Sequence, residues 1–214
     1  MKDIFIFSAG PGGRDLFQLI NDINLQEETW NILGYVDSDK DLQSKSFDGL
    51  EVFSPDYIQN QNLDELYGAC GILDSGIRQK IVKNEILSCG LRIPSLVHPS
   101  SAIAHDFVPR EGLIVFSGVN ISYNVVIEKH VLVSFNSLVG HDSKVGEYVS
   151  LLPCTTIDGK CSIGKNSILG SGSIIHPGVS IGSNVTVGIG TVILDDVEND
   201  ITITQLPRMI KLKK

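Results

Sequence analysis

Two adjacent side chains, His141 and Asp142, are suited to moving a proton. His141 comes two residues after an aliphatic member of a six-residue repeat, at a position that other repeats fill with lysine, glutamate or serine. Imidazole titrates near neutral pH, so it can accept a proton as a bond forms. We therefore predict that His141 is a general base; the alternative is a solvated surface histidine. Asp142 is interpreted as a turn residue, because Asn, Asp and Gly recur at its position.

A glycine-rich turn, Ala9-Gly10-Pro11-Gly12-Gly13, follows the first predicted strand, residues 4–8, and Arg14 comes directly after it. Backbone amides in such a turn can approach a phosphate closely. Asp37 ends the second predicted strand, residues 32–36, where a ribose or base is commonly bound. The alternative is a tight turn before a helix, since Asp15 stands where a dinucleotide motif has its third glycine.

A repeat of six residues must position the candidate base. Every sixth residue from 121 onward is aliphatic, thirteen times in succession: Ile121, Ile127, Val133, Val139, Val145, Leu151, Ile157, Ile163, Leu169, Ile175, Ile181, Val187 and Ile193. Position four after each of these is small or β-branched, and position three is rich in Asn, Asp and Gly, which tolerate a left-handed backbone. This period predicts short parallel strands meeting at corners, with three hexads, or eighteen residues, in each coil.

The residues before the repeats have a different pattern. Predicted strands at 4–8, 32–36 and 70–73 alternate with predicted helices near 14–23 and 77–87, which indicates a small βαβ sheet. We therefore predict an α/β, Rossmann-like domain over 1–93, an all-β parallel β-helix over 94–200, and a tail over 201–214.

The whole chain resembles the hexapeptide-repeat acyltransferases, and within them the bacterial nucleotide-sugar N-acetyltransferases and the related sialic acid O-acetyltransferase-like proteins. The matching segments are Phe7-Ser8-Ala9-Gly10-Pro11-Gly12-Gly13-Arg14, Gly34-Tyr35-Val36-Asp37-Ser38-Asp39, Val97-His98-Pro99-Ser100-Ser101, Val139-Gly140-His141-Asp142 and Leu206-Pro207-Arg208-Met209-Ile210. The resemblance implies a left-handed coil, acetyl-CoA as co-substrate, and a nucleotide-linked 4-amino sugar held by the N-terminal turn and Asp37. It also implies that Asp142, the acidic neighbour of His141, orients the imidazole. One departure is Ser150, where many members carry a second histidine.

Further residues are predicted to bind the acyl donor. Gly159 lies eighteen residues, one coil, after His141, so its amide could face the thioester oxygen; the alternative is a corner glycine. The resemblance places the pantetheine arm along Gly170, Ser171, Gly188 and Ile189. We predict no metal, because the histidines are scattered: His98 and His105 fall in the first coil, and His130 and His176 are interpreted as isolated surface positions.

Composition narrows the classes of partner. The chain has 214 residues, 42% of them hydrophobic, and a net charge of −8, which argues against nucleic-acid binding. The four cysteines show no CxxC spacing, and no signal or membrane segment is visible, so we predict a cytoplasmic protein. The basic tail, Lys211, Lys213 and Lys214, is interpreted as a solvated terminus.

Three functions remain open: N-acetylation of a nucleotide-linked amino sugar, O-acetylation of sialic acid or another glycan, and non-catalytic binding by a β-helix. The glycine turn with Asp37 favours the first, and His141 disfavours the third. We also predict a homotrimer, because Val126, Leu132, Leu138 and Leu152 would form an outer apolar face that a single copy leaves wet.

Overall fold

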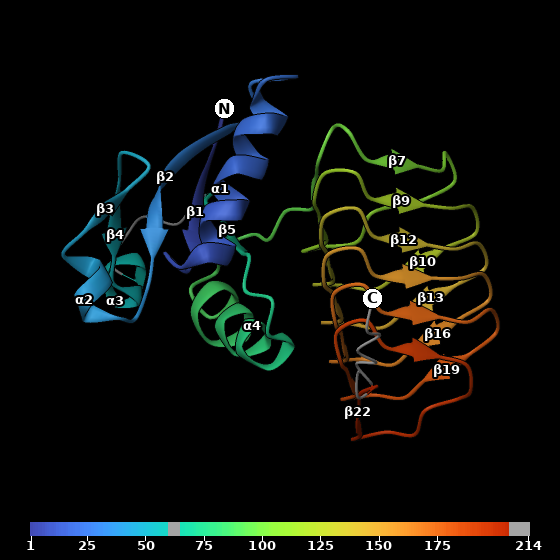
Figure 1. Ribbon diagram of the computed structural model, residues 1–214. Helices are drawn as coiled ribbons and strands as arrows, with labels where there is room; N and C mark the ends of the chain where they lie inside the picture. The colour runs from blue at the N-terminus through green and yellow to red at the C-terminus, as the bar shows by residue number, and fades with distance from the viewer. Residues whose placement is uncertain (60–64, 206–214) are drawn as a thin grey trace, which may run out of the picture.

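The computed structural model describes residues 1–59 and 65–205, and its elements form an N-terminal α/β part packed beside a stack of parallel coils (Figure 1). The segment 206–210 and the basic tail, noted above, lie outside the described residues. Within the described part, no helix is long and apolar enough to cross a membrane.

The N-terminal part is built on a five-stranded sheet of order β3-β4-β2-β1-β5. Its strands are β1 (Lys2–Phe7), β2 (Trp30–Val36), β3 (Ser46–Phe47), β4 (Leu50–Phe53) and β5 (Tyr67–Cys70). Only β3 is antiparallel to its neighbour. β1 lies inside the sheet between β2 and β5, and its last four residues are buried, as expected for an apolar run covered on both faces. The predicted third strand, 70–73, was placed three residues too late.

Four helical segments of the N-terminal part and a π-helical turn accompany this sheet: α1 (Pro11–Asn24), α2 (Lys40–Gln43), α3 (Pro55–Gln59), α4 (Ser75–Ile81) and η1 (Val82–Leu87). α1 starts with Gly10 as its N-cap and proline at its first position, a favoured start because proline lacks an amide hydrogen and has a helical φ. The sequence predicted α1 and a single helix at 77–87, which the structure divides into α4 and η1.

The second part consists of two-residue strands arranged in three parallel sheets, so that each sheet is one face of a prism. The polar face has β10 (Val126–Ile127), β13 (Lys144–Val145), β16 (Ser162–Ile163) and β19 (Ser180–Ile181). The docked face has β6 (Leu96–Val97), β8 (Ile114–Val115), β11 (Leu132–Val133), β14 (Ser150–Leu151), β17 (Ile168–Leu169), β20 (Thr186–Val187) and β22 (Thr202–Ile203). The apolar face has β7 (Ala102–Ile103), β9 (Asn120–Ile121), β12 (Leu138–Val139), β15 (Thr156–Ile157), β18 (Ile174–Ile175) and β21 (Val192–Ile193).

The six-residue period is confirmed as a parallel β-helix. Neighbouring strands pair eighteen residues apart, as Leu138 does with Thr156, except that β20 and β22 pair sixteen residues apart. The thirteen predicted aliphatic residues are all buried in one continuous core. Nine of the thirteen hexads have Asn, Asp or Gly three positions after the aliphatic residue, and eight of these nine residues have a positive φ: Asn124, Asn136, Asp142, Asn166, Gly172, Gly178, Asn184 and Gly190. The ninth, Asp196, does not adopt this conformation.

The N-terminal part covers the docked face. Leu16, Leu19 and Ile20 of α1 form one buried cluster with Leu96, Ile114 and Leu132 of the first coils. Leu132 is therefore fully buried within a single chain. The prediction that Val126, Leu132, Leu138 and Leu152 form one outer apolar face was wrong. Val126, Leu132 and Leu138 belong to three different faces, and Leu152 follows a strand of the docked face.

Arg78 of α4 fastens the two parts together and is 2% exposed. Its guanidinium donates six hydrogen bonds, all to neutral oxygens, which belong to His130, Ile72, Leu73, Ser150, Tyr148 and Val149. Burial lowers the pKa of Arg78 to about 10. His130 is buried beside this contact and stacks on Tyr148, so its interpretation as a surface residue was wrong.

Candidate active site

The candidate base, His141, lies in the turn after β12, where the chain passes from the apolar face to the polar face. Its Nδ1 atom is 2.8 Å from Oδ2 of Asp142, and its side chain is 42% exposed. Asp142 has a φ of 59°, so it is both the corner residue and the partner of the imidazole. The two interpretations offered by the sequence therefore describe one residue with two roles.

The preceding coil supplies two contacts that the sequence analysis missed. The ring of Tyr123 is stacked on the His141 ring, with centroids 5.3 Å apart and planes 7° apart. Nδ2 of Asn124 donates to Oδ1 of Asp142 over 2.6 Å. These hydrogen bonds, from Asn124 first and then His141, hold the pKa of Asp142 below its ordinary value. Tyr123 and Asn124 each stand eighteen positions before the residue that they contact. The length of one coil could therefore have predicted both contacts from the sequence.

The following coil places Gly159 against the other edge of the imidazole. A Cβ atom at Gly159 would lie 2.6 Å from Nε2 of His141, so a larger residue would collide with that edge of the ring. Among residues 1–59 and 65–205, no acceptor takes the amide hydrogen of Gly159. A free donor next to an imidazole is an arrangement that can stabilise a developing oxyanion.

A cavity of about 560 Å³ opens at this corner. It is lined by Ser122, Leu138, Gly140, His141, Asp158, Gly159, Lys160 and Pro177. Leu138 belongs to the exposed surface of the apolar face, so the cavity borders that face directly.

The other predicted donor residues lie elsewhere in the chain. Gly170, Ser171, Gly188 and Ile189 follow β17 and β20, in the turns that lead from the docked face to the apolar face. His141 and Gly159 occupy turns at the opposite edge of the apolar face. The structure therefore does not bring the two sets together within one chain. Ile189 is 78% exposed.

Ser150 does not line the cavity beside His141. It is fully buried in β14 on the docked face, where its hydroxyl accepts from Arg78 over 2.8 Å and donates to the Leu73 carbonyl over 2.6 Å. The position where relatives are expected to carry a second histidine is used here to attach the N-terminal part.

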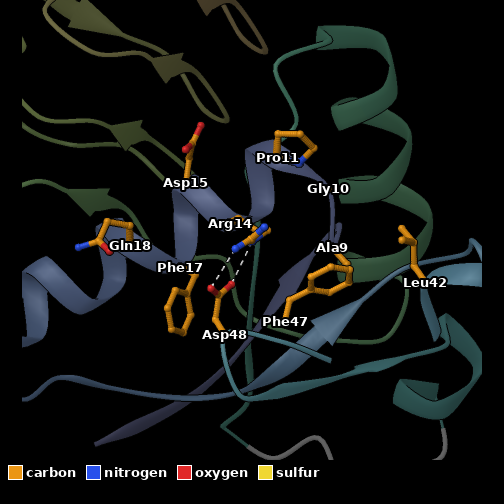
Figure 2. A pocket seen from close by; sticks show the side chains of 10 residues that line it. All are labelled: Ala9, Gly10, Pro11, Arg14, Asp15, Phe17, Gln18, Leu42, Phe47 and Asp48. Carbon is orange, nitrogen blue, oxygen red and sulfur yellow. Dashed lines mark hydrogen bonds and ion pairs between the residues drawn. The ribbon is translucent and has the colours of Figure 1, made fainter. Parts of the chain in front are cut away.

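The N-terminal turn borders a second cavity, of about 600 Å³ (Figure 2). Its lining comprises Ala9, Gly10, Pro11, Arg14, Asp15, Phe17, Gln18, Leu42, Phe47 and Asp48. Arg14 lies over the Phe47 ring and pairs with Asp48 through Nε, at 3.2 Å, and Nη2, at 3.3 Å. Asp48 also accepts from the Tyr35 hydroxyl over 2.7 Å, and these donors, Arg14 first, lower the pKa of Asp48.

Gly12, Gly13 and Asp37 do not line this cavity. A Cβ at Gly12 would collide with the Gly71 carbonyl, and one at Gly13 with the Ser8 carbonyl, so both glycines allow α1 to approach the sheet. The Asp37 carboxylate accepts the amides of Ala9 and Asp39, each over 2.9 Å. Asp37 therefore holds the backbone of the turn, while Gly10, Pro11 and Arg14 line the cavity. Among the described residues no group of three or more His, Cys, Asp or Glu side chains is placed to hold a metal ion.

Comparisons with known proteins agree with this architecture. A family model described as bacterial transferase hexapeptide (six repeats) matches residues 160–198. A variant of perosamine N-acetyltransferase from Caulobacter crescentus, solved in complex with CoA and GDP-perosamine, matches with a TM-score of 0.87 at 23% identity, over 100% of this chain and 98% of that one. The acetyltransferase domain of PglB from Neisseria gonorrhoeae matches with a TM-score of 0.85 at 22% identity, over 96% and 97% of the two chains. At these identities the structures establish a shared fold.

A curated relative is closer in sequence. GDP-perosamine N-acetyltransferase from Escherichia coli O157:H7 is 30% identical over 174 residues, which cover 81% of this chain and 78% of that protein. The chain therefore belongs to the hexapeptide-repeat acetyltransferase family that includes GDP-perosamine N-acetyltransferase.

Proposed function

We propose that this protein transfers the acetyl group of acetyl-CoA to the amino group of a nucleotide-linked 4-amino sugar, with His141 as general base. The observation that carries the proposal is the His141–Asp142 pair beside the unpaired amide of Gly159. The relative from Escherichia coli, named for N-acetylation of GDP-perosamine, supports the class of acceptor.

The geometry suits acyl transfer to an amine. Asp142 accepts the hydrogen on Nδ1 of His141, which leaves the Nε2 lone pair to take a proton. As the amine nitrogen bonds to the acetyl carbon, Nε2 accepts the proton that the nitrogen loses. The carbon–sulfur bond then breaks, and the protonated imidazole returns this proton to the sulfur, which leaves as the CoA thiol. The Gly159 amide can donate to the carbonyl oxygen while that oxygen is negative.

The acceptor's nucleotide is assigned to the N-terminal cavity. We infer that residues 1–93 act as a Rossmann-like nucleotide-binding domain, residues 94–200 as the left-handed acyltransferase domain, and residues 201–214 as a tail. Arg14 would release Asp48 to meet a phosphate, since an exposed ion pair holds its partners weakly. Phe47 offers an aromatic surface next to it.

A homotrimer would complete the donor site. The predicted donor residues lie at opposite edges of the apolar face, and that face exposes Leu138, Ile174 and Val192. Packing this face against a second copy covers those side chains and brings Ser171 and Ile189 of one copy toward His141 of the next. The four free thiols accord with a cytoplasmic location.

The proposal is tested by acetyl-CoA turnover against GDP-, UDP- and dTDP-linked 4-amino sugars, with free sialic acid beside them. We expect turnover with one of the nucleotide-linked amines and none with sialic acid. Turnover with sialic acid alone would instead support the O-acetyltransferase function, and turnover with no acceptor in the panel would contradict the proposal.

Two substitutions separate the roles of the two cavities. His141→Asn should lower kcat by about 10²- to 10⁴-fold and leave both KM values near wild type, because a general base acts in the transition state. Arg14→Gln should raise KM for the acceptor only. This variant is a better probe than a change at Gly12, since a side chain there would collide with Gly71 and disturb the fold. A normal kcat in folded His141→Asn would remove that residue from the mechanism.

A further inference from the structure

We propose that Asn124 is a positioning residue that fixes the tautomer and the plane of the His141 imidazole by holding the Asp142 carboxylate. This inference rests on the proposed function, in which His141 is the base. It assigns a role to a residue that touches neither predicted substrate site.

The contacts form a chain across three coils. The backbone N–H of Asn124 donates to Oδ2 of Asp106 over 2.7 Å. The side-chain nitrogen of Asn124, Nδ2, donates to Oδ1 of Asp142 over 2.6 Å. The second carboxylate oxygen of Asp142 is then the one that meets Nδ1 of His141. Asn124 thus fixes which oxygen is available to the imidazole.

This arrangement decides which nitrogen carries the hydrogen. A carboxylate is an acceptor only, so the nitrogen that faces it must be protonated in the neutral ring. With Asp142 anchored, Nδ1 carries the hydrogen and Nε2, which faces Gly159, is left as the acceptor. Without the anchor, Asp142 can rotate away and both tautomers become accessible, so that part of the population presents a hydrogen where a lone pair is needed.

The corner conformation makes Asn124 suited to this task. It has a φ of 55°, a region that asparagine and glycine tolerate better than other residues. Of the residues with this tolerance, asparagine brings a donor long enough to reach the next coil. Tyr123 adds a second restraint, because its ring covers one face of the imidazole.

The matched control is Asn184, which has the same geometry far from His141. Its φ is 56° and its Nδ2 donates to Oδ1 of Asp200 over 2.8 Å, again between neighbouring coils. A change at Asn184 therefore removes the same kind of contact and leaves the imidazole untouched.

The first experiment is kinetic and uses Asn124→Gly, which keeps the left-handed backbone free of strain. We expect kcat to fall about 10- to 100-fold, as for other small losses of alignment, with both KM values near wild type. Asn124→Asp keeps the size and adds a negative charge against the carboxylates of Asp106 and Asp142. The other charged groups near His141 are Asp158 and Lys160, which line its cavity. The kcat/KM profile of Asn124→Asp should rise at higher pH than that of wild type, because the added carboxylate favours the protonated imidazole. Asn184→Gly should match wild type in both measurements.

The second experiment does not depend on activity. Nitrogen chemical shifts of ¹⁵N-histidine-labelled protein, with the His141 signals identified from their absence in His141→Asn, report the tautomer directly. We expect a single Nδ1–H tautomer in wild type and in Asn184→Gly, and a mixture in Asn124→Gly. A single unchanged tautomer in folded Asn124→Gly, or an unchanged kcat there, would overturn the inference. If wild type acetylated no acceptor, the proposed function would fail while the tautomer measurement still decided the role of Asn124.

Discussion

At the scale of single residues, the site is a column of side chains stacked at the eighteen-residue period. Tyr123, His141 and Gly159 occupy equivalent positions in three successive coils, and each contacts the next. A β-helix repeats its backbone geometry at this interval, so residues at equivalent positions of neighbouring coils lie next to each other. A side chain in one coil can therefore hold the orientation of a side chain in the next.

Gly159 is the member of the column whose size matters most. In Gly159→Ala, the new Cβ would lie 2.6 Å from Nε2 of His141, so the ring must tilt away from its hydrogen bond to Asp142. We expect kcat to fall about 10-fold or more while the free energy of unfolding changes little, because the ring edge borders an open cavity. Steady-state kinetics and urea unfolding measure the two quantities.

The control for this variant is Gly76→Ala. Gly76 is an exposed helical glycine in α4 where a Cβ would meet only Asp74 Oδ1, at 3.4 Å. It should keep wild-type kcat and gain up to about 1 kcal/mol of stability. An equal loss of kcat in both variants would contradict a specific role for Gly159.

The nearness of Gly159 to His141 could be predicted from the repeat, because eighteen residues make one coil. The pairing of His141 with Asp142 was expected from the resemblance to the family. Asn124 and Tyr123 obey the same spacing but do not stand out by residue type, since asparagine and tyrosine suit an exposed corner equally well. Asp48 could not be found, because it reaches Arg14 from a hairpin thirty-four residues away whose strands, β3 and β4, left no clear alternation.

At the scale of elements, the β-helix was predictable and the sheet only in part. The aliphatic residue that recurs in every hexad indicates the strands of the β-helix directly from the sequence. β5, in contrast, has the sequence Tyr-Gly-Ala-Cys, which has little β-propensity. Tertiary packing explains that composition. A Cβ at Gly68 would lie 2.8 Å from Ile86 and 2.9 Å from Phe7, so small residues are needed where η1 closes on the sheet. Such a requirement is invisible until the neighbours are in place.

The contact between α4 and the docked face depends on Arg78. Arg78→Met should lower the free energy of unfolding by about 3 kcal/mol, because several buried carbonyl oxygens lose their donor. The control, Arg110→Met, removes an exposed ion pair with Glu128 and should cost less than about 1 kcal/mol. Urea unfolding of both variants checks this prediction, and equal losses would contradict it.

At the scale of the whole molecule, the three faces of the prism have different surfaces. The docked face is covered by the N-terminal part, and the outward residues of the polar face include Lys144, Ser162 and Ser180. The apolar face exposes Ile174, at 41%, between its neighbours Thr156 and Val192. This difference supports the proposal, made above, that the apolar face packs against a second copy.

If the proposed trimer forms through this face, Ile174→Asp should convert it to single chains of 23.2 kDa, because three carboxylates would have to be buried near one axis. Light scattering at micromolar concentration measures the mass. Ser162→Asp, an exposed change at the corresponding position on the polar face, should leave the mass of three chains. A wild-type mass of one chain would contradict the trimer itself.

The separation of His141 from Ile189 across the apolar face has a genetic consequence. If each site draws its base from one chain and its donor surface from the next, two defective alleles can complement each other. A gene carrying His141→Asn and a gene carrying Ile189→Asp would each yield an inactive enzyme. Expressed in one cell, they would form mixed assemblies in which some junctions join an intact base to an intact donor surface, and part of the activity would return.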